Sequence, residues 1–115
     1  MSLSKLLNTV KFLQKCIIVS KDGKILTLRR DPNDDRRPNC WDLPGGNYEA
    51  GESVEDCIKR EVREETSLIV QAIRPVYVAS NMGPTYQDIN VIALTQQCDQ
   101  WEGEVKLSDE HVDFH

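Results

Sequence analysis

One segment of this sequence has a clear helical pattern, and short apolar runs separated by turn residues lie on both sides of it. From 54 to 65 the apolar residues recur at the spacing of an amphipathic helix. Ser53 stands where the N-cap is expected, and Asp56 follows three residues later in a capping-box-like position. A single strong helix among strand patterns predicts an α/β layered domain of the α+β kind.

The apolar runs predict β-strands, and the turns between them are polar. Lys21-Asp22-Gly23-Lys24 has the Asp-Gly hairpin signal, and a polar loop with two prolines at 31–39 leads to an extended piece before Pro44-Gly45-Gly46. The tail from Trp101 onward is acidic and mixed. Strands are expected at 16–20, 25–29, 69–73, 76–80 and 89–95.

The first residues place apolar side chains at roughly helical spacing, so a helix is expected there that gives way to a strand near Phe12. Polar residues interrupt the apolar ones, so no signal-peptide core is expected. The apolar positions are Leu3, Leu6, Leu7, Val10 and Leu13.

Composition fits one small globular domain, residues 1–115, with 39% apolar and 29% charged residues. No run of about 18 apolar residues occurs, so no transmembrane helix is expected. The cysteines (Cys16, Cys40, Cys57 and Cys98) form no C-x-x-C pair, which favours reduced thiols in a cytoplasmic protein. Both histidines, His111 and His115, are at the end of the chain, so a zinc site is not expected.

The net charge of −5 argues against a broad surface for extended nucleic acid. It does not argue against a nucleotide substrate, because a bridging cation can bring a phosphate to carboxylates.

Glutamates of the predicted helix point towards the protein body. At about 100° per residue, Glu61 and Glu65 fall inside the apolar arc, and Glu64 falls at its edge. Arg60 can pair with Glu64 one turn away, which would leave Glu61 and Glu65 without partners. Buried unpaired carboxylates are costly, so the pattern alone leaves a divalent-metal site and a buried salt-bridge network equally open.

The loop before the helix favours the metal site. Gly45 and Gly46 allow unusual backbone dihedrals and close approach to a ligand, and the loop leads into a helix N-terminus, which favours anions.

The spacing of these residues resembles the signature of the Nudix hydrolase (MutT-like) family. The order is Gly46, five residues, Glu52, seven residues, Arg60-Glu61-Val62, one residue, Glu64-Glu65, one residue, then Ser67-Leu68. The family has glycine where this chain has Ser67, and every other fixed position matches. The lead-in from Trp41 to Gly46 is also similar to that of the family.

The resemblance implies an α/β/α sandwich with a mixed sheet and hydrolysis of the diphosphate linkage in a nucleoside diphosphate derivative, with Mg²⁺ or Mn²⁺. It implies metal ligands at Glu61, Glu64 and Glu65, with a carbonyl at Gly45 or Gly46 as a further ligand. Arg60 would orient Glu64, and Glu52 would support the loop or bind metal through water. The general base, a signature glutamate or an acid in a later loop, stays open, with Glu110 the candidate in the later loop. A cation at Arg29 or Arg30 would contact phosphate.

Two departures bear on these expectations. Ser67 stands where glycine relieves a left-handed backbone, which predicts altered stability rather than lost chemistry. The chain ends at His115, where family members usually continue with a strand and a helix, so truncation and cover by a partner chain, as in a homodimer, both stay open.

A nucleotide-binding or regulatory module without catalysis is the alternative to a working enzyme. Aromatic residues that could stack on a base are Trp41, Tyr48, Tyr77, Tyr86 and Trp101.

Overall fold

The computed structural model describes residues 10–80 and 90–115. The expected N-terminal helix residues before Val10, the strand start at Ile89 and the candidate base-stacking residue Tyr86 lie outside these ranges. The elements are β1 (Val10–Ile18), β2 (Leu28–Arg30), β3 (Trp41–Asp42), β4 (Gly45–Asn47), α2 (Val54–Thr66), β5 (Ile69–Gln71), β6 (Arg74–Ser80), β7 (Asn90–Cys98), β8 (Gln100–Glu102) and β9 (His111–Phe114).

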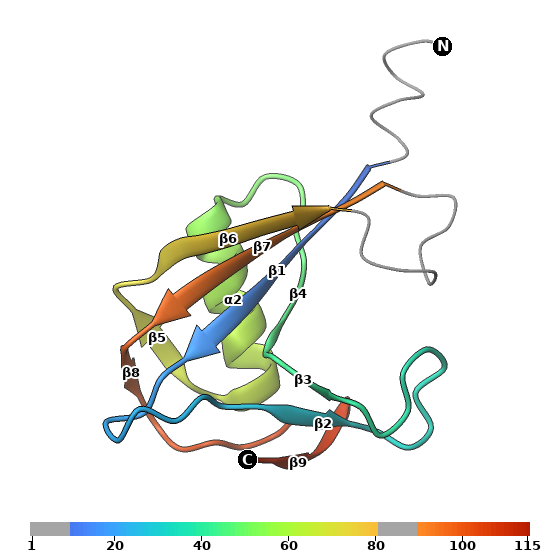
Figure 1. The fold of residues 1–115 in the computed structure, drawn as a ribbon, viewed down its shortest axis with the longest axis vertical. Coiled ribbons are helices and arrows are strands. Elements are labelled where there is room, and N and C mark those ends of the chain that lie inside the picture. Colours follow the sequence, from blue (N-terminus) through green and yellow to red (C-terminus); the bar gives the residue numbers. More distant parts are fainter. Residues whose placement is uncertain (1–9, 81–89) are drawn as a thin grey trace, which may run out of the picture.

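A four-stranded mixed sheet forms the centre of the fold, in the order β4-β1-β7-β6 (Figure 1). Strands β1 and β7 are parallel and pair along their whole length, from Val10 opposite Asn90 to Ile18 opposite Cys98. Strands β4 and β6 pair antiparallel on the two sides. The predicted mixed α+β architecture is confirmed.

The expected helical spacing at Val10 and Leu13 is wrong for these residues, because both lie in strand β1. The strand begins six residues before the predicted start at Cys16. Its nine backbone partners come from β7, about 80 residues away in the chain, and such pairing overrides a weak local pattern.

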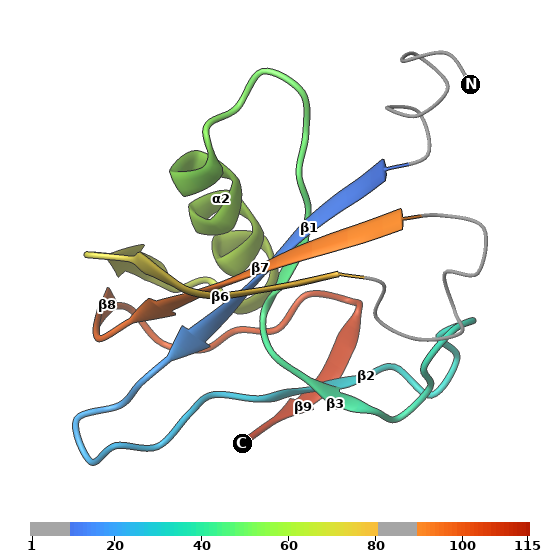
Figure 2. The same cartoon turned by 45° about the horizontal axis from the view of Figure 1, so that its top comes forward.

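Helix α2 covers one face of this sheet, as Figure 2 shows. Ile58 and Val62 are fully buried against Cys16, Ile18 and neighbouring apolar residues. The predicted cap is confirmed, since Ser53 Oγ accepts a hydrogen bond from the Asp56 amide at 3.0 Å. This packing fixes which side of the helix faces the sheet, and therefore where its glutamates point.

Buried amides tie the start of α2 to the sheet. Gln96 donates to Gln14 at 2.6 Å, and Gln14 donates to the Val54 carbonyl at 3.0 Å. Both glutamine side chains are buried, so these bonds satisfy polar groups that would otherwise be costly.

A smaller sheet in the order β3-β2-β9 lies beside the first. The hairpin turn before β2 is confirmed, with Gly23 at φ 81° and the Ser20 amide bonded to the Lys24 carbonyl at 2.8 Å. The acidic and mixed tail, for which no strand was predicted, contains most of β8, which pairs with β5, and β9, which pairs with β2. Neither tail strand has a local signal, because each forms only through its distant partner.

Candidate functional site

A cleft of about 220 Å³ lies between helix α2, strands β1 and β4, and the loop after β2. One wall is acidic and the other is basic. The acids come from α2 and from the residue before β9, and the cations come from β1, the end of β2 and the following loop. The charged lining residues are Glu61, Glu65, Glu110, Lys11, Lys15, Arg30, Arg36 and Arg37.

Glu65 lies at the inner end of the acidic wall, and only 5% of the residue is exposed. Its Oε1 accepts a hydrogen bond from the Gly45 amide at 2.7 Å. Burial raises the pKa of Glu65 to about 7, despite the opposing effects of that hydrogen bond and of nearby Lys15. The helical-wheel prediction of an inward acid is confirmed here.

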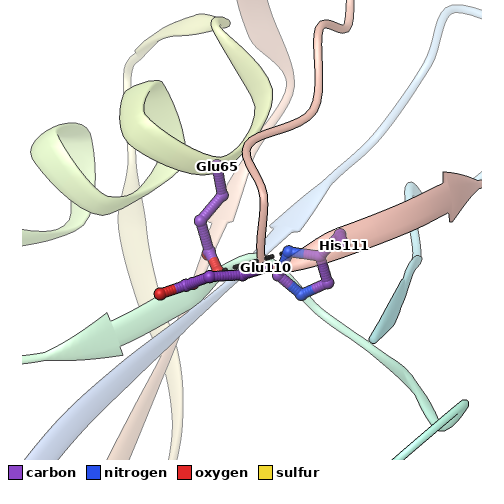
Figure 3. Close-up of side chains that lie close together, drawn as sticks. All are labelled: Glu65, Glu110 and His111. Atoms are coloured by element: carbon purple, nitrogen blue, oxygen red, sulfur yellow. Dashed lines mark ion pairs between the residues drawn. The ribbon is translucent and has the colours of Figure 1, made fainter. Parts of the chain in front are cut away.

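His111 lies against the other oxygen of Glu65. Its Nδ1 is 3.7 Å from Glu65 Oε2 and has no hydrogen-bond partner among the described residues (Figure 3). Burial lowers the pKa of His111, which favours the neutral imidazole. One ligand atom each of Glu65, Glu110 and His111 lie within 4.8 Å of one another.

No role was predicted for His111 beyond the expectation that the chain has no zinc site, and no local signal marks this residue. The residue begins β9, and the pairing of β9 with β2 brings it beneath the last turn of α2. Only knowledge of that long-range pairing would have identified it.

Arg60 connects several acids of the site. Its guanidinium donates to both Glu52 oxygens, at 3.0 Å from Nε and 2.8 Å from Nη2, and Nη1 donates to Glu61 at 2.9 Å. Its contacts with Glu64 are longer, at 3.4–3.5 Å. The expected pair of Arg60 with Glu64 is present, but the expectation that Glu61 lacks a partner is wrong, because Arg60 also bonds to Glu61. The loop before α2 folds back and places Glu52 beside Arg60, which makes Glu52 its main partner.

These bonds set the charge states of the acids. The hydrogen bonds from Arg60 lower the pKa of Glu52 to about 2. Burial raises the pKa of Glu61, and the neighbouring Arg60 opposes this shift. Glu52 supports the loop, where its Oε1 also accepts from the Glu49 amide at 3.0 Å.

The two glycines allow the close approach of strand β4 to both walls. A Cβ at Gly46 would lie 2.4 Å from Glu61 Oε2, and a Cβ at Gly45 would lie 2.1 Å from the Gln14 carbonyl oxygen. Gly45 also has φ +151°, which side chains disfavour. The space that a side chain would fill is occupied by the carboxylate in one case and by backbone in the other.

The remaining expected residues lie at different depths. The Glu64 side chain is 59% exposed and does not line the cleft. Arg30 lines the cleft, whereas Arg29 does not and donates instead to Asn39 at 2.8 Å. The structure therefore brings Glu61, Glu65, Glu110, Gly45, Gly46 and Arg30 together at one cleft.

The donor set fits a hard divalent cation. The acidic wall presents carboxylate oxygens, the ligands that Mg²⁺ and Mn²⁺ prefer. Mutual repulsion with Glu110 adds to burial in raising the pKa of both Glu61 and Glu65. A bound cation would remove that repulsion. Glu61 and Glu65 would hold it from α2, with Glu64 of the same helix as the further expected ligand, and Glu110 faces the same cleft.

Comparison with known proteins assigns the chain to a family. The NUDIX domain model matches residues 14–115. The chain belongs to the NUDIX family. The Nudix resemblance of the signature residues is thereby confirmed over most of the chain.

Individual relatives cover different shares of their own length. The ADP-ribose pyrophosphatase of Methanocaldococcus jannaschii is 37% identical over 95 residues, which are 81% of this chain and 53% of the relative. Nucleoside triphosphatase NudI of Escherichia fergusonii is 32% identical over 107 residues, 86% of this chain and 76% of the relative. This chain thus spans about half of the first relative and three quarters of the second.

The fold also matches a solved structure. The MutT NUDIX hydrolase from Burkholderia pseudomallei superposes with a TM-score of 0.79 at 24% identity, covering 92% of this chain and 81% of that chain. The likeness shows the fold. Among residues 10–80 and 90–115, no helix has the length and apolar character needed to cross a membrane.

Proposed function

We propose that this chain hydrolyses the diphosphate linkage of a nucleoside diphosphate derivative, with Mg²⁺ as the cofactor and Mn²⁺ as a substitute. The observation that carries the proposal is the inward pair Glu61 and Glu65, which share one cleft with Glu110 and the two glycines of β4. Relatives named ADP-ribose pyrophosphatase and nucleoside triphosphatase support the same reaction class.

The bound cation would neutralise phosphate oxygens and polarise the phosphorus that is attacked. The residues of the chain supply the rest. Arg60 keeps Glu61 in place through its bond at 2.9 Å, while its bonds to Glu52 hold the loop. The Gly45 amide orients Glu65 through the bond at 2.7 Å. These bonds preorganise the acidic wall before substrate arrives.

Glu110 is the proposed general base. It lines the cleft, whereas Glu64 does not and has an exposed side chain. Its carboxylate takes a proton from the attacking water while the water oxygen bonds to phosphorus and the bond from phosphorus to the bridging oxygen breaks. The bridging oxygen leaves with the departing phosphate, and the proton is released afterwards.

The reaction is tested by product analysis on a panel of nucleoside triphosphates, nucleotide sugars, ADP-ribose and dinucleoside polyphosphates. Each is incubated with Mg²⁺ or with a chelator, using the native chain and Glu64→Gln. Metal-dependent cleavage of a diphosphate linkage that collapses in Glu64→Gln is the expected result. Folded protein that cleaves no compound would overturn the proposal and favour a nucleotide-binding module without catalysis.

A further inference from the structure

The basic wall of the cleft has more positive charge than its own acids neutralise. We propose that Lys15, Arg30, Arg36 and Arg37 form an anion subsite for a third phosphate, so that the preferred substrates are nucleoside triphosphates. This inference rests on the proposed function. It chooses between the two substrates in the relatives' names, ADP-ribose and nucleoside triphosphates.

Three of these cations converge on one carboxylate. Asp42 Oδ2 lies 3.0 Å from Lys15 Nζ, 3.3 Å from Arg37 Nη2 and 4.0 Å from Arg30 Nη1. Arg30 has a second partner, Asp34, at 2.7 Å. Two aspartates therefore serve three cations, which leaves an excess of one positive charge.

Arg36 adds to this excess. Its backbone amide bonds to Asp34 Oδ1 at 3.0 Å, but its side chain makes no ion pair or hydrogen bond with a described residue. The side chain is exposed and lines the cleft. The loop at 31–39 is also held in place through Asp34, whose Oδ1 accepts from the amides of Arg36 and Arg37. A fixed loop presents these guanidinium groups at little entropic cost.

The cations lie close enough to the acids for one polyphosphate to contact both walls. Lys15 and Arg30 line the same cleft of about 220 Å³ as Glu65 and Glu110, and Lys15 opposes the rise in the pKa of Glu65. Divalent metal ions on the acidic wall would neutralise the diphosphate of the substrate. The substrate group that follows the diphosphate would then lie against the basic wall.

The chemistry of that next group separates the candidate substrates. In ADP-ribose or a nucleotide sugar it is a neutral sugar, which gains little from excess positive charge. In a nucleoside triphosphate it is a further phosphate, whose oxygens accept charge-assisted and bidentate bonds from arginine. The charge balance of the wall thus matches the triphosphate.

The test compares steady-state kinetics on a nucleoside triphosphate and on ADP-ribose, with saturating Mg²⁺ and at two salt concentrations. The variants are Arg36→Gln alone and Arg36→Gln with Arg37→Gln. The single variant removes no side-chain ion pair or hydrogen bond seen within 10–80 and 90–115, so it should fold like the native chain. Lys24→Gln with Arg74→Gln is the charge-matched control, because both residues are exposed and neither lines the cleft.

The ratio of kcat/KM for the triphosphate to that for ADP-ribose is expected to fall about 10- to 100-fold in the double variant, mainly through KM, and several-fold in the single variant. The native KM for the triphosphate should also rise more steeply with salt than that of the double variant. The control should keep the native ratio.

An unchanged kcat/KM ratio in both variants, or an equal loss of kcat/KM on both substrates, would overturn the inference. The proposed hydrolase function would still stand. A native chain that cleaves ADP-ribose but no triphosphate would also overturn it. Folded native protein that cleaves neither compound would instead refute the proposed function.

Discussion

Gly45→Ala and Gly46→Ala should produce different defects, although the two residues are adjacent. The first should mainly lose stability, and the second should mainly lose metal affinity. At Gly46 the added Cβ would lie 2.4 Å from Glu61 Oε2 and 2.5 Å from its Cδ. The carboxylate is the end of a side chain, so it can move by about 1 Å to restore normal contact. That movement breaks its bond with Arg60 and removes it from the metal position.

The size of each expected effect depends on whether a side chain or the backbone must move. For Gly46→Ala we expect a metal affinity about 10- to 100-fold lower, as when a ligand is misplaced. Arg60 keeps its bonds to Glu52, so the stability cost should be about 1 kcal/mol, or about 4 °C for a domain of this size. At Gly45 the Cβ would lie 2.1 Å from the Gln14 carbonyl and 2.8 Å from Lys15 Cα, and this β1 backbone cannot yield without opening the β1–β4 pairing.

Gly45→Ala should therefore lose at least about 3 kcal/mol through overpacking and the lost Gly45–Glu65 hydrogen bond, a drop of about 12 °C or more. Thermal unfolding in chelator and Mn²⁺ titration by calorimetry measure the two effects separately. Gly51→Ala is the reference for backbone strain without a clash, because Gly51 has φ +92°, nothing lies within 4 Å of its added Cβ and it does not line the cleft, so Gly45→Ala should lose more stability than Gly51→Ala. Native Mn²⁺ affinity in Gly46→Ala, or native stability in Gly45→Ala, would refute the steric reasoning.

Three further predictions concern residues around the site. His111→Leu should weaken Mn²⁺ binding about 10-fold by leaving Glu65 Oε2 without its neighbour, whereas His111→Asn, which keeps a nitrogen near the position of Nδ1, should bind close to native in the same titration. Ser67→Gly should unfold about 4 °C above Ser67→Ala, because both lose the bond from Ser67 Oγ to the Lys106 carbonyl but only glycine relieves the left-handed backbone at φ 68°; equal melting temperatures would contradict this. Arg60 holds the pKa of Glu52 at about 2, below the ordinary 4.5, so this pair stabilises the fold above pH 4.5 and the contribution fades as the pH falls towards 2. The difference in melting temperature between native protein and Glu52→Gln should therefore shrink from pH 7 to pH 3, and a constant difference would count against it.

Local patterns predicted the parts of the site that lie on one element. The helical wheel gave the inward direction of Glu65, and the structure buries that residue to 5% exposure. The cap at Ser53 also followed from short-range rules, whereas the left-handed backbone at Ser67 was expected from the glycine that the family has there. These features depend on residues within a few positions of one another, which a sequence displays directly.

The parts that depend on distant contacts were not predictable. The main partner of Arg60 is Glu52 rather than Glu64, because the loop before the helix folds back onto it. The position of His111 depends on β9 pairing with β2, more than 80 residues earlier in the chain. The shared use of Asp42 by three cations likewise requires β1, β2 and the following loop to be assembled.

The most direct test of the account is Mg²⁺-dependent turnover of the best substrate by Glu61→Gln, compared with Glu55→Gln on the same helix. Glu61 lines the cleft, whereas Glu55 is exposed and pairs with Lys59 at 2.9 Å. Glu61→Gln is expected to lose at least about 100-fold in kcat with its fold intact, and Glu55→Gln is expected to turn over like the native chain. Native turnover by Glu61→Gln, or turnover by native protein in excess chelator, would contradict the claim that the acids of α2 hold the catalytic metal.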